Sequence, residues 1–361
     1  MHNDGASVPD RRLSEDSPAR RKMARLADVA RLAGVSTATV DRVLNRRPGV
    51  REITVQRVLK AAAELDYIAE ADLQAALAPK PMRVAFLLPA GTNRFLNMLG
   101  RLIAGAGPQL EPLHVRCRVE HIKSFNPDLL ARALIQQSRN ADGIVFMALE
   151  HPAVREAVNT LAERGIPTVT LISDIAGSRR AAYVGLDNRS AGRTAGYLIG
   201  RFIGQRPAKV AMIAGSLSYR AHEEREMGFL HIFQELFPSI EVVGLREGQD
   251  EEDRNFRLTR ALLAQHPDLA GIYNIGGGAG GVGKALKEAR REPDVVFIGH
   301  GLTPDTRGLL IDGTMDAVIT QNPQAALTSC VAIFTNLRAG RDPWEGVEVP
   351  RIDVVFRENL R

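Results

Sequence analysis

Cysteine and aromatic residues are scarce in this 361-residue chain. It contains only two cysteines, Cys117 and Cys330, and one tryptophan, and aromatic residues make up 5% of the sequence. Two distant cysteines provide neither a disulfide framework nor the paired spacing of a metal site. No apolar run approaches the roughly 18 to 20 residues that a membrane helix needs. We therefore expect reduced thiols in a cytoplasmic protein that has no membrane partner.

Catalytic signatures are also missing from the sequence. There is no G-x-S-x-G elbow and no H-E-x-x-H pair, and the eight histidines are scattered along the chain. We therefore expect no enzymatic activity, no metal site and no cofactor. Residues 1–22 are polar and charged without an apolar core, which predicts a disordered tail rather than a signal peptide.

Positive charge is concentrated near the N-terminus. The formal charge of the whole chain is +5, yet residues 20–60 hold eleven Lys or Arg against three Asp or Glu. That stretch therefore carries +8, and the remainder of the chain carries −3. A basic module joined to a nearly neutral body favours a local contact with a polyanion such as nucleic acid.

Residues 25–67 have the pattern of three short helices. The apolar residues that recur at steps of three and four in the first helix are Leu26, Val29, Ala30 and Ala33. Gly34 can end that helix because glycine tolerates the positive φ of a sharp turn, and Ser36 can cap the next helix. A third helix is predicted at roughly residues 52–65. This is a helix-turn-helix pattern, in which the second helix fits the DNA major groove.

These residues closely resemble the DNA-binding headpiece of lac-repressor-type (LacI/GalR) bacterial transcription regulators. The segments that carry the resemblance are Asp28-Val-Ala, Ala33-Gly-Val-Ser, Arg42-Val-Leu-Asn, Pro48-Gly-Val and Tyr67. They keep several fixed spacings over about forty positions, which makes the match specific. A small helical bundle with no role in DNA binding is the alternative.

The resemblance implies a set of DNA contacts for the headpiece, residues 23–68. The positions that read bases in the family hold Thr37, Ala38 and Arg42. The positions that contact phosphates hold Ser36, Thr39, Asn45, Arg51 and Thr54. Arg42 can bind guanine in a bidentate fashion, or it can merely neutralise a phosphate. Asp41 departs from the family's small hydroxyl residue and would repel phosphate, unless it orients a neighbouring arginine.

Residues 69–82 are predicted to be a hinge and linker. In the family this segment forms a helix on the operator and inserts a leucine into the minor groove, which kinks the DNA. The wedge position holds Ala76 here, and Leu77 follows one residue later. Either Leu77 acts as the wedge in a shifted register, or the segment is only a tether.

From residue 83 onward, short apolar runs alternate with amphipathic stretches, which is the pattern of a doubly wound α/β fold. The runs that read as buried strands begin at Val84, Gly143, Thr168, Val210, Gly271 and Val295. The pattern resembles the two-lobed type I periplasmic-binding-protein fold, the sensor domain of lac-repressor-type regulators. By this likeness, lobe 1 comprises about 83–187 and 321–346, and lobe 2 comprises about 188–320 and 347–361.

The resemblance also implies an effector cleft between the lobes. The residues at its expected binding positions are Asn93, Phe95, Ser173, Asp174, Arg225, Asn274, His300 and Gln321. The alternatives are a helix N-cap for Asn93 and a surface salt bridge for Arg225. Gly301 replaces an aspartate that commonly binds sugar hydroxyls, and residues 276–278 are glycines where the family has a polar group. These departures imply an effector that is larger, or less densely hydroxylated, than a simple hexose.

The segment Gly278–Lys284 suggests a different function. It differs by one residue from the phosphate-binding loop G-x-x-x-x-G-K-[ST], because Ala285 replaces the hydroxyl residue that would hold Mg²⁺. A nucleotide-binding enzyme is therefore one alternative, and a solute-binding protein is another. We favour a homodimeric repressor that binds a palindromic operator in double-stranded DNA and is controlled by a small, carbohydrate-like effector.

Overall fold

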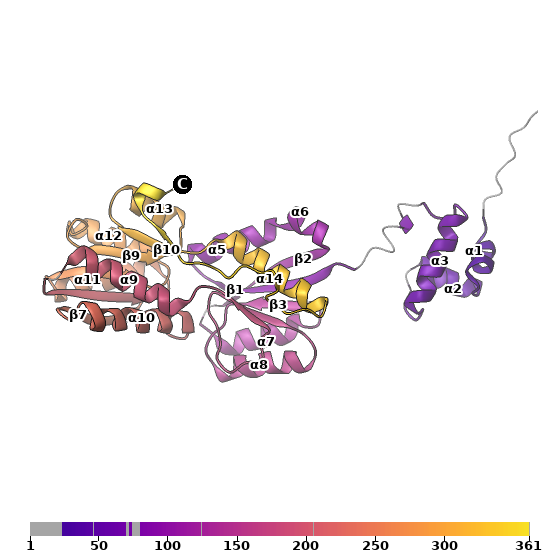
Figure 1. Ribbon diagram of the computed structural model, residues 1–361, viewed down its shortest axis with the longest axis horizontal. Helices are drawn as coiled ribbons and strands as arrows, with labels where there is room; N and C mark the ends of the chain where they lie inside the picture. Colours follow the sequence, from indigo (N-terminus) through magenta and orange to yellow (C-terminus); the bar gives the residue numbers. More distant parts are fainter. Residues whose placement is uncertain are drawn as a thin grey trace, which may run out of the picture. The chain divides into compact units, whose positions relative to one another are not determined.

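The structure is a computed structural model that describes residues 24–45, 47–69, 72–73, 80–123, 125–204 and 206–360. The chain divides between Lys80 and Pro81 into two compact units. We call the first the headpiece and the second the sensor unit (Figure 1). Among the described residues, no helix has both the length and the apolar character needed to span a bilayer.

The headpiece consists of three helices around a small apolar core. They are α1 (Leu26–Ala33), α2 (Thr37–Leu44) and α3 (Glu52–Glu64). Gly34 ends α1 with φ = 63°, and the Ser36 hydroxyl accepts a hydrogen bond of 3.2 Å from the amide of Thr39 at the start of α2. The fully buried residues of the core are Val29, Val40, Val58 and Ala62. The predicted helix-turn-helix pattern is thereby confirmed.

Lobe 1 of the sensor unit contains a parallel five-stranded sheet in the order β2-β1-β3-β4-β5. The strands are β1 (Met82–Ala90), β2 (Val115–Lys123), β3 (Gly143–Phe146), β4 (Thr168–Leu171) and β5 (Ala182–Val184). Helices pack on both faces of the sheet: α5 (Arg94–Gly105), α6 (Gly107–Leu110), the short 3₁₀ helix η1 (Glu111–Leu113), α7 (Pro127–Gln137), α8 (Pro152–Glu163) and α14 (Pro323–Arg338). Although α14 comes late in the sequence, its apolar residues belong to this core.

Lobe 2 contains a six-stranded sheet in the order β11-β10-β9-β8-β6-β7, in which only β11 runs antiparallel to its neighbour. Its strands are β6 (Ala208–Ala214), β7 (Ile240–Glu247), β8 (Leu269–Asn274), β9 (Val296–His300), β10 (Ala317–Thr320) and β11 (Asp353–Val355). Its helices are α9 (Asn188–Ile203), α10 (Arg220–Leu236), α11 (Glu252–Gln265), α12 (Ala279–Ala289), α13 (Pro304–Ile311) and η2 (Arg357–Asn359). The doubly wound α/β prediction is therefore confirmed.

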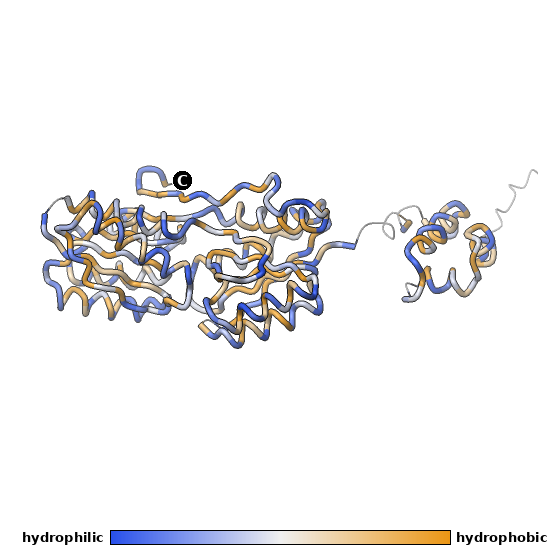
Figure 2. Tube along the Cα trace, turned by 60° about the horizontal axis from the view of Figure 1, so that its bottom comes forward, coloured by the Kyte–Doolittle hydropathy of each residue, from blue (hydrophilic) through white to orange (hydrophobic). Residues whose placement is uncertain are grey.

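The chain passes between the lobes more than once. It enters lobe 2 between β5 and α9, returns to lobe 1 between β10 and α14, and ends beside β10 in lobe 2 (Figure 1). Val347 still packs against the core of lobe 1, and Ile352 packs against that of lobe 2, so the last crossing lies between these two residues. Figure 2 shows apolar stretches running along the strands inside both lobes.

The lobes are in direct contact in this structure. Tyr219, in the loop between β6 and α10 of lobe 2, is 2% exposed and belongs to the apolar core of lobe 1. Its ring lies 5.5 Å from that of Phe125 in an edge-to-face arrangement, measured between centroids. The amide of Glu150 in lobe 1 donates a hydrogen bond of 2.9 Å to the carbonyl of Ser218. The buried ring of Tyr219 therefore holds the two lobes in contact near Phe125.

Candidate DNA interface and effector cavity

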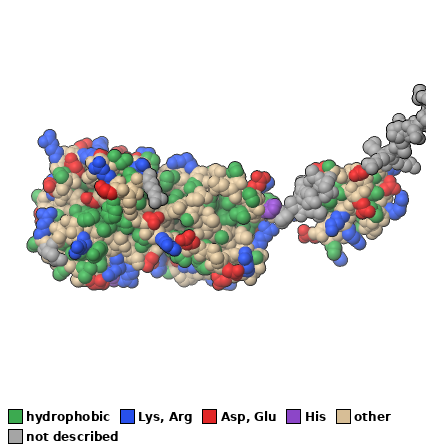
Figure 3. All heavy atoms as spheres, turned by 45° about the horizontal axis from the view of Figure 1, so that its top comes forward, with side chains coloured by type: hydrophobic (Ala, Val, Ile, Leu, Met, Phe, Trp, Pro, Cys, Tyr) green, Lys and Arg blue, Asp and Glu red, His purple; other side chains and the backbone are tan. Residues whose placement is uncertain are grey.

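The second headpiece helix presents its polar side to the surface. Val40 and Val43 are buried, whereas Thr37, Ala38 and Arg42 are exposed. Most of the predicted DNA-contact residues surround one concave surface between α2 and the start of α3: Ser36, Ala38, Thr39, Arg42, Arg51 and Thr54. Thr37 and Asn45 do not line this concavity. Figure 3 shows Lys and Arg side chains on the headpiece surface.

Asp41 has a specific arrangement within this surface. Its carboxylate accepts a hydrogen bond of 2.7 Å from Asn45 Nδ2 and lies 3.3 Å from Arg47 Nη1. The predicted interaction with a neighbouring arginine is therefore present, and the carboxylate offsets part of the local positive charge. Because both members of the ion pair are largely exposed, the pair adds little stability and mainly orients Arg47. The hinge candidates Ala76 and Leu77, and the tail at residues 1–22, lie outside the described residues.

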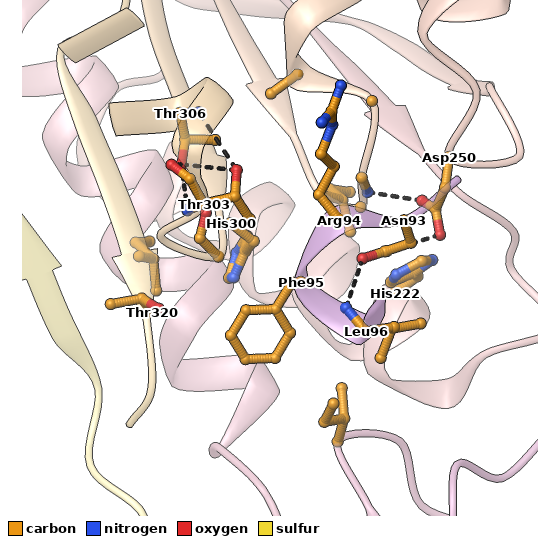
Figure 4. Close-up of a pocket in the computed structure, with 18 of the residues that line it drawn as sticks. Asn93, Arg94, Phe95, Leu96, His222, Asp250, His300, Thr303, Thr306 and Thr320 are labelled. Carbon is orange, nitrogen blue, oxygen red and sulfur yellow. Dashed lines mark hydrogen bonds between the residues drawn. The ribbon is translucent and has the colours of Figure 1, made fainter. Parts of the chain in front are cut away.

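The sensor unit encloses a cavity between its lobes, with about 750 Å³ of empty space that is partly open to solvent. Small-molecule sites commonly lie in concave regions between domains or lobes. Five of the eight predicted effector residues line it: Asn93, Phe95, Arg225, His300 and Gln321. Figure 4 shows Phe95 projecting between His300 and the Asn93 loop. Gln321 is 7% exposed, and its buried Oε1 has no hydrogen-bond partner within the described chain.

Three predicted effector residues do not line the cavity, because other protein groups engage them. Ser173 is fully buried, and its hydroxyl is 3.4 Å from the amide of Ala221. Asp174 pairs with Arg180. Asn274 is also fully buried, and its Nδ2 donates bonds of 3.0 Å to the carbonyls of Gly276 and Gly277. These residues shape the loops around the cavity rather than its wall.

Asn93 acts as a helix cap and also connects the two lobes. Its Oδ1 accepts a hydrogen bond of 3.1 Å from the amide of Leu96 at the start of α5. Its Nδ2 donates a bond of 3.0 Å to Asp250 of lobe 2 (Figure 4). The N-cap alternative is correct but incomplete, because the same side chain also reaches across the cleft.

Arg225 is not a surface residue. It is 7% exposed, its Nε donates a bond of 2.8 Å to Asn188 Oδ1, and its Nη1 donates a bond of 2.8 Å to the carbonyl of Ile275. Burial lowers its pKa, although a guanidinium stays charged in proteins. The surface salt-bridge alternative is therefore wrong: Arg225 is a buried cation at the cavity wall whose acceptors are both neutral.

Two residues that sequence reasoning missed, His222 and Asp250, also line the cavity. His222 Nδ1 lies 2.9 Å from the carbonyl oxygen of Ser216. Asp250 is 8% exposed and accepts a bond of 2.6 Å from the amide of Gly277. A signal for His222 was available, since it lies one helical turn before Arg225 on α10. Asp250 comes from the loop between β7 and α11, where the sequence shows only a cluster of acidic residues.

Burial determines the protonation of the two cavity histidines. It lowers the pKa of His222 to about 4 and holds that of His300 well below its ordinary value. The Tyr273 hydroxyl lies 2.6 Å from His300 Nε2, and burial raises the pKa of that tyrosine. Both imidazoles are therefore neutral at pH 7. Within the described residues, no group of three His, Cys, Asp or Glu side chains could hold a metal ion.

The glycine-rich segment is the start of a helix that packs closely against its neighbour. Gly278 caps α12 in the left-handed conformation, with φ = 71°. A Cβ at Gly281 would lie 1.9 Å from the carbonyl oxygen of Glu252, so only glycine permits this approach of α12 to α11. The Lys284 ammonium lies 4.9 Å from the centre of the Phe256 ring. These contacts explain the glycines and the lysine without a bound phosphate.

Comparison with known proteins separates the two units in the same way. Residues 25–70 match the bacterial regulatory proteins of the lacI family, and residues 129–342, more than half of the chain, match the periplasmic binding protein domain. The chain is a lacI-family regulatory protein with a periplasmic-binding-protein sensor domain. It is accordingly a DNA-binding transcriptional regulator, and neither a nucleotide-binding enzyme nor a solute-binding protein is favoured.

Several curated relatives of this lacI-family chain are repressors. The HTH-type transcriptional repressor PurR of Vibrio vulnificus is 27% identical over 67% of this chain and 68% of its own length. The ribose operon repressor of Halalkalibacterium halodurans is 26% identical over 75% of this chain and 78% of its own. The probable repressor ExuR of Bacillus subtilis is 22% identical over 76% and 80%, respectively.

The sensor unit also resembles solved structures. GanP, a glucose-galactose binding protein from Geobacillus stearothermophilus, aligns with a TM-score of 0.70 and 26% identity over 78% of this chain and 99% of its own. A solute-binding protein from Burkholderia graminis in complex with D-arabinose aligns with a TM-score of 0.70 at 22% identity, over 78% and 98%. The latter likeness supports the fold alone.

Proposed function

We propose that this protein acts in the cytoplasm as a homodimeric repressor that binds a palindromic operator and responds to a carbohydrate-like effector. The observation that carries the proposal is the presence, in one chain, of a helix-turn-helix unit and of a cavity walled by both sensor lobes. A ligand that contacts both lobes binds one lobe arrangement more tightly than another. This difference in affinity can couple effector binding to DNA binding by the headpiece.

The proposed DNA contacts follow from exposure and chemistry. Thr37, Ala38 and Arg42 stand at the exposed N-terminal part and outer face of α2, where a recognition helix meets base edges. The arginine can bind guanine O6 and N7, and the threonine and alanine can contact a thymine methyl. Ser36, Thr39, Asn45, Arg51 and Thr54 are proposed to contact phosphates, which position the helix without reading sequence. Two such headpieces in a dimer would contact two half-sites.

The proposed effector contacts lie in the interlobe cavity. Arg225 offers buried N–H donors, Gln321 offers a buried acceptor that has no partner among the described residues, and Phe95 offers an apolar surface. This combination of hydrogen-bonding groups with one aromatic ring suits a hydroxylated ring compound. The ribose operon repressor and the glucose-galactose binding protein among the similar proteins support the same class.

The test has two stages. The full chain is first screened by thermal shift against sugars, polyols and sugar acids, with ATP and Mg²⁺ included; a ligand at 100 times its Kd should stabilise the fold by roughly 2.7 kcal/mol. DNA selected in vitro by the protein is then titrated with and without the ligand that was found. We expect a palindromic site and an affinity change of about 5- to 150-fold.

Two variants separate the functions. Gln321→Leu should weaken effector binding and leave operator affinity in the absence of effector unchanged, whereas Arg42→Ala should weaken operator binding and leave effector binding unchanged. Selected DNA without two-fold symmetry would contradict the dimeric operator. Stabilisation by ATP and Mg²⁺ alone would contradict the carbohydrate effector.

A further inference from the structure

Charged side chains of opposite sign are equal in number around the interlobe cavity. Those that line it are Arg94, Arg225, Asp250 and Asp305. Arg94 Nε lies 2.6 Å from Asp305 Oδ2, and Arg94 Nη2 also lies 3.6 Å from Glu252 Oε1, so neighbouring carboxylates neutralise this arginine. Because His222 and His300 are both neutral at pH 7, the wall of the cavity carries no net charge. The other two charges, on Arg225 and Asp250, form no ion pair within 4 Å in the described part of the chain.

The Asp250 side chain reaches the cavity through an unusual backbone. Asp250 has φ = 60° and follows Gln249 with φ = 54°, so two consecutive non-glycine residues adopt the left-handed conformation. Such strain persists only where the surroundings impose it, and it is frequent at functional sites. A Cβ at Gly215 or Gly276 would lie 2.4 or 2.5 Å from Asp250 Oδ1. These two glycines therefore create the space that the carboxylate occupies.

Asp250 also accepts hydrogen bonds from two residues of lobe 1. Its Oδ2 accepts a bond of 3.0 Å from Asn93 Nδ2, and its carbonyl accepts a bond of 3.0 Å from the Thr92 hydroxyl. With the Gly277 amide on Oδ1, the carboxylate has two neutral donors. An ionised carboxylate can accept about four hydrogen bonds, so acceptor capacity remains at the cavity wall.

The guanidinium of Arg225 offers the complementary capacity. It has five N–H groups, and the bonds to Asn188 and to the Ile275 carbonyl use two of them. The cavity wall therefore holds the Asp250 carboxylate, which can accept further hydrogen bonds, and the Arg225 guanidinium, which can donate further hydrogen bonds. Hydroxyl groups both donate and accept, so a neutral polyhydroxy compound can satisfy both. An anionic compound would gain at Arg225 but would be repelled by Asp250 in the same low-dielectric cavity.

We propose that the effector is an uncharged polyhydroxy compound and that Asp250 is the residue that selects it over sugar acids and sugar phosphates. The inference rests on the proposed carbohydrate effector and specifies its charge class. The position after β9 where the resemblance expects a carboxylate is Gly301, and a Cβ there would lie 3.2 Å from Phe95 Cβ. The cavity carboxylate that is not paired with Arg94, that of Asp250, comes instead from the loop between β7 and α11.

The experiment compares matched compounds on the full-length protein by isothermal titration calorimetry. The probes are D-glucose with D-glucuronate and glucose 6-phosphate, D-galactose with D-galacturonate, and D-ribose with ribose 5-phosphate. Wild-type protein should bind at least one neutral member, and its acidic partner should bind at least 10-fold more weakly. Asp250→Asn, which keeps the shape and removes the charge, should bind the neutral compound about 10-fold or more weakly and should reduce or reverse the discrimination against the acid.

Asp268→Asn is the matched control, because this aspartate belongs to the same lobe, pairs with Lys209 and does not line the cavity. It should keep wild-type selectivity. Preference of the wild type for an acid or a phosphate would overturn the charge class while leaving effector control intact. Unchanged selectivity in a folded Asp250→Asn variant would overturn the role of Asp250. Failure of every carbohydrate to bind would overturn the carbohydrate class, and this inference with it.

Discussion

Substitution of Gly192 by alanine tests whether the close packing of α9 on α10 holds the cavity in shape. A Cβ at position 192 would lie 2.0 Å from the carbonyl oxygen of Arg225 and 2.7 Å from its carbonyl carbon. These are backbone atoms, so they cannot move aside as the end of a side chain can. The two helices would have to separate by roughly 1 Å, and Arg225 would move away from Asn188 and from the cavity.

The expected magnitude is the difference between two effects. Overpacking costs about 1–3 kcal/mol, and more when the backbone must shift, whereas alanine stabilises a helix interior by up to about 1 kcal/mol relative to glycine. We therefore expect Gly192→Ala to lower the free energy of unfolding by roughly 2 kcal/mol. Effector affinity should fall as well, because the guanidinium would be displaced.

The assay is urea unfolding of the full-length chain followed by far-UV circular dichroism. Gly308→Ala is the matched control, because Gly308 also lies within a helix but its Cβ would meet nothing within 4 Å. That variant should be stabilised by about 0.5–1 kcal/mol, so the two alanines should act with opposite signs. Equal stabilisation by both would refute the reasoning, since it would mean that α9 and α10 have room to spare.

Three further predictions concern the lobe contact, the buried histidine and the recognition helix. Tyr219→Ala should cost about 3–5 kcal/mol and increase the radius of gyration in small-angle scattering, because it removes the ring that lobe 2 buries in lobe 1; the exposed Tyr197→Ala should do neither. The pKa of His222 falls from 6.5 to about 4 on folding, so the unfolded chain binds its proton first as the pH drops. Stability should therefore be complete above pH 6.5 and should decline by about 3 kcal/mol between pH 6.5 and 4, whereas in His222→Asn this component of the urea-midpoint profile should be absent. Arg42→Ala should relax selectivity at one base pair of each half-site by about 1–3 kcal/mol in competition binding, and a uniform loss on all sequences would indicate a phosphate contact instead.

Periodicity predicted the central strands better than the edge strands. β3, β4 and β8 are buried along their whole length, so each reads as a continuous apolar run. β2 lies at the edge of its sheet and carries Arg116, Arg118 and Glu120 at alternate positions. β7 is likewise an edge strand with a glycine and charged residues. Both were missed because an edge strand with a polar face has no continuous apolar signal.

The candidate site was predicted only in part, for a related reason. Residues at the ends of strands or shortly after them, such as His300, Gln321 and Asn93, can be placed at the cleft because the carboxyl ends of parallel strands meet there. Asp250 could not be placed, because its access depends on Gly215 and Gly276, which belong to two other loops. The segment Gly278–Lys284 suggested a phosphate-binding loop for a similar reason. Its glycines allow α12 to pack closely on α11, and the sequence alone does not show that contact.

The contacts of Arg225 connect the cavity with the segment at which the chain crosses between lobes. The guanidinium binds Asn188, the first residue of α9, and the Nδ2 of that asparagine donates a bond of 2.9 Å to the hydroxyl of Tyr183 on β5 of lobe 1. The same hydroxyl lies 2.9 Å from the carbonyl of Leu186 within the crossing. A ligand that accepts hydrogen bonds from the remaining N–H groups of Arg225 therefore contacts a residue of lobe 2 that is linked, through Asn188 and Tyr183, to lobe 1 and to the crossing segment. Because these groups are buried and hydrogen-bonded to one another, we expect a change in lobe angle to rearrange them together, which favours discrete lobe arrangements over continuous flexibility.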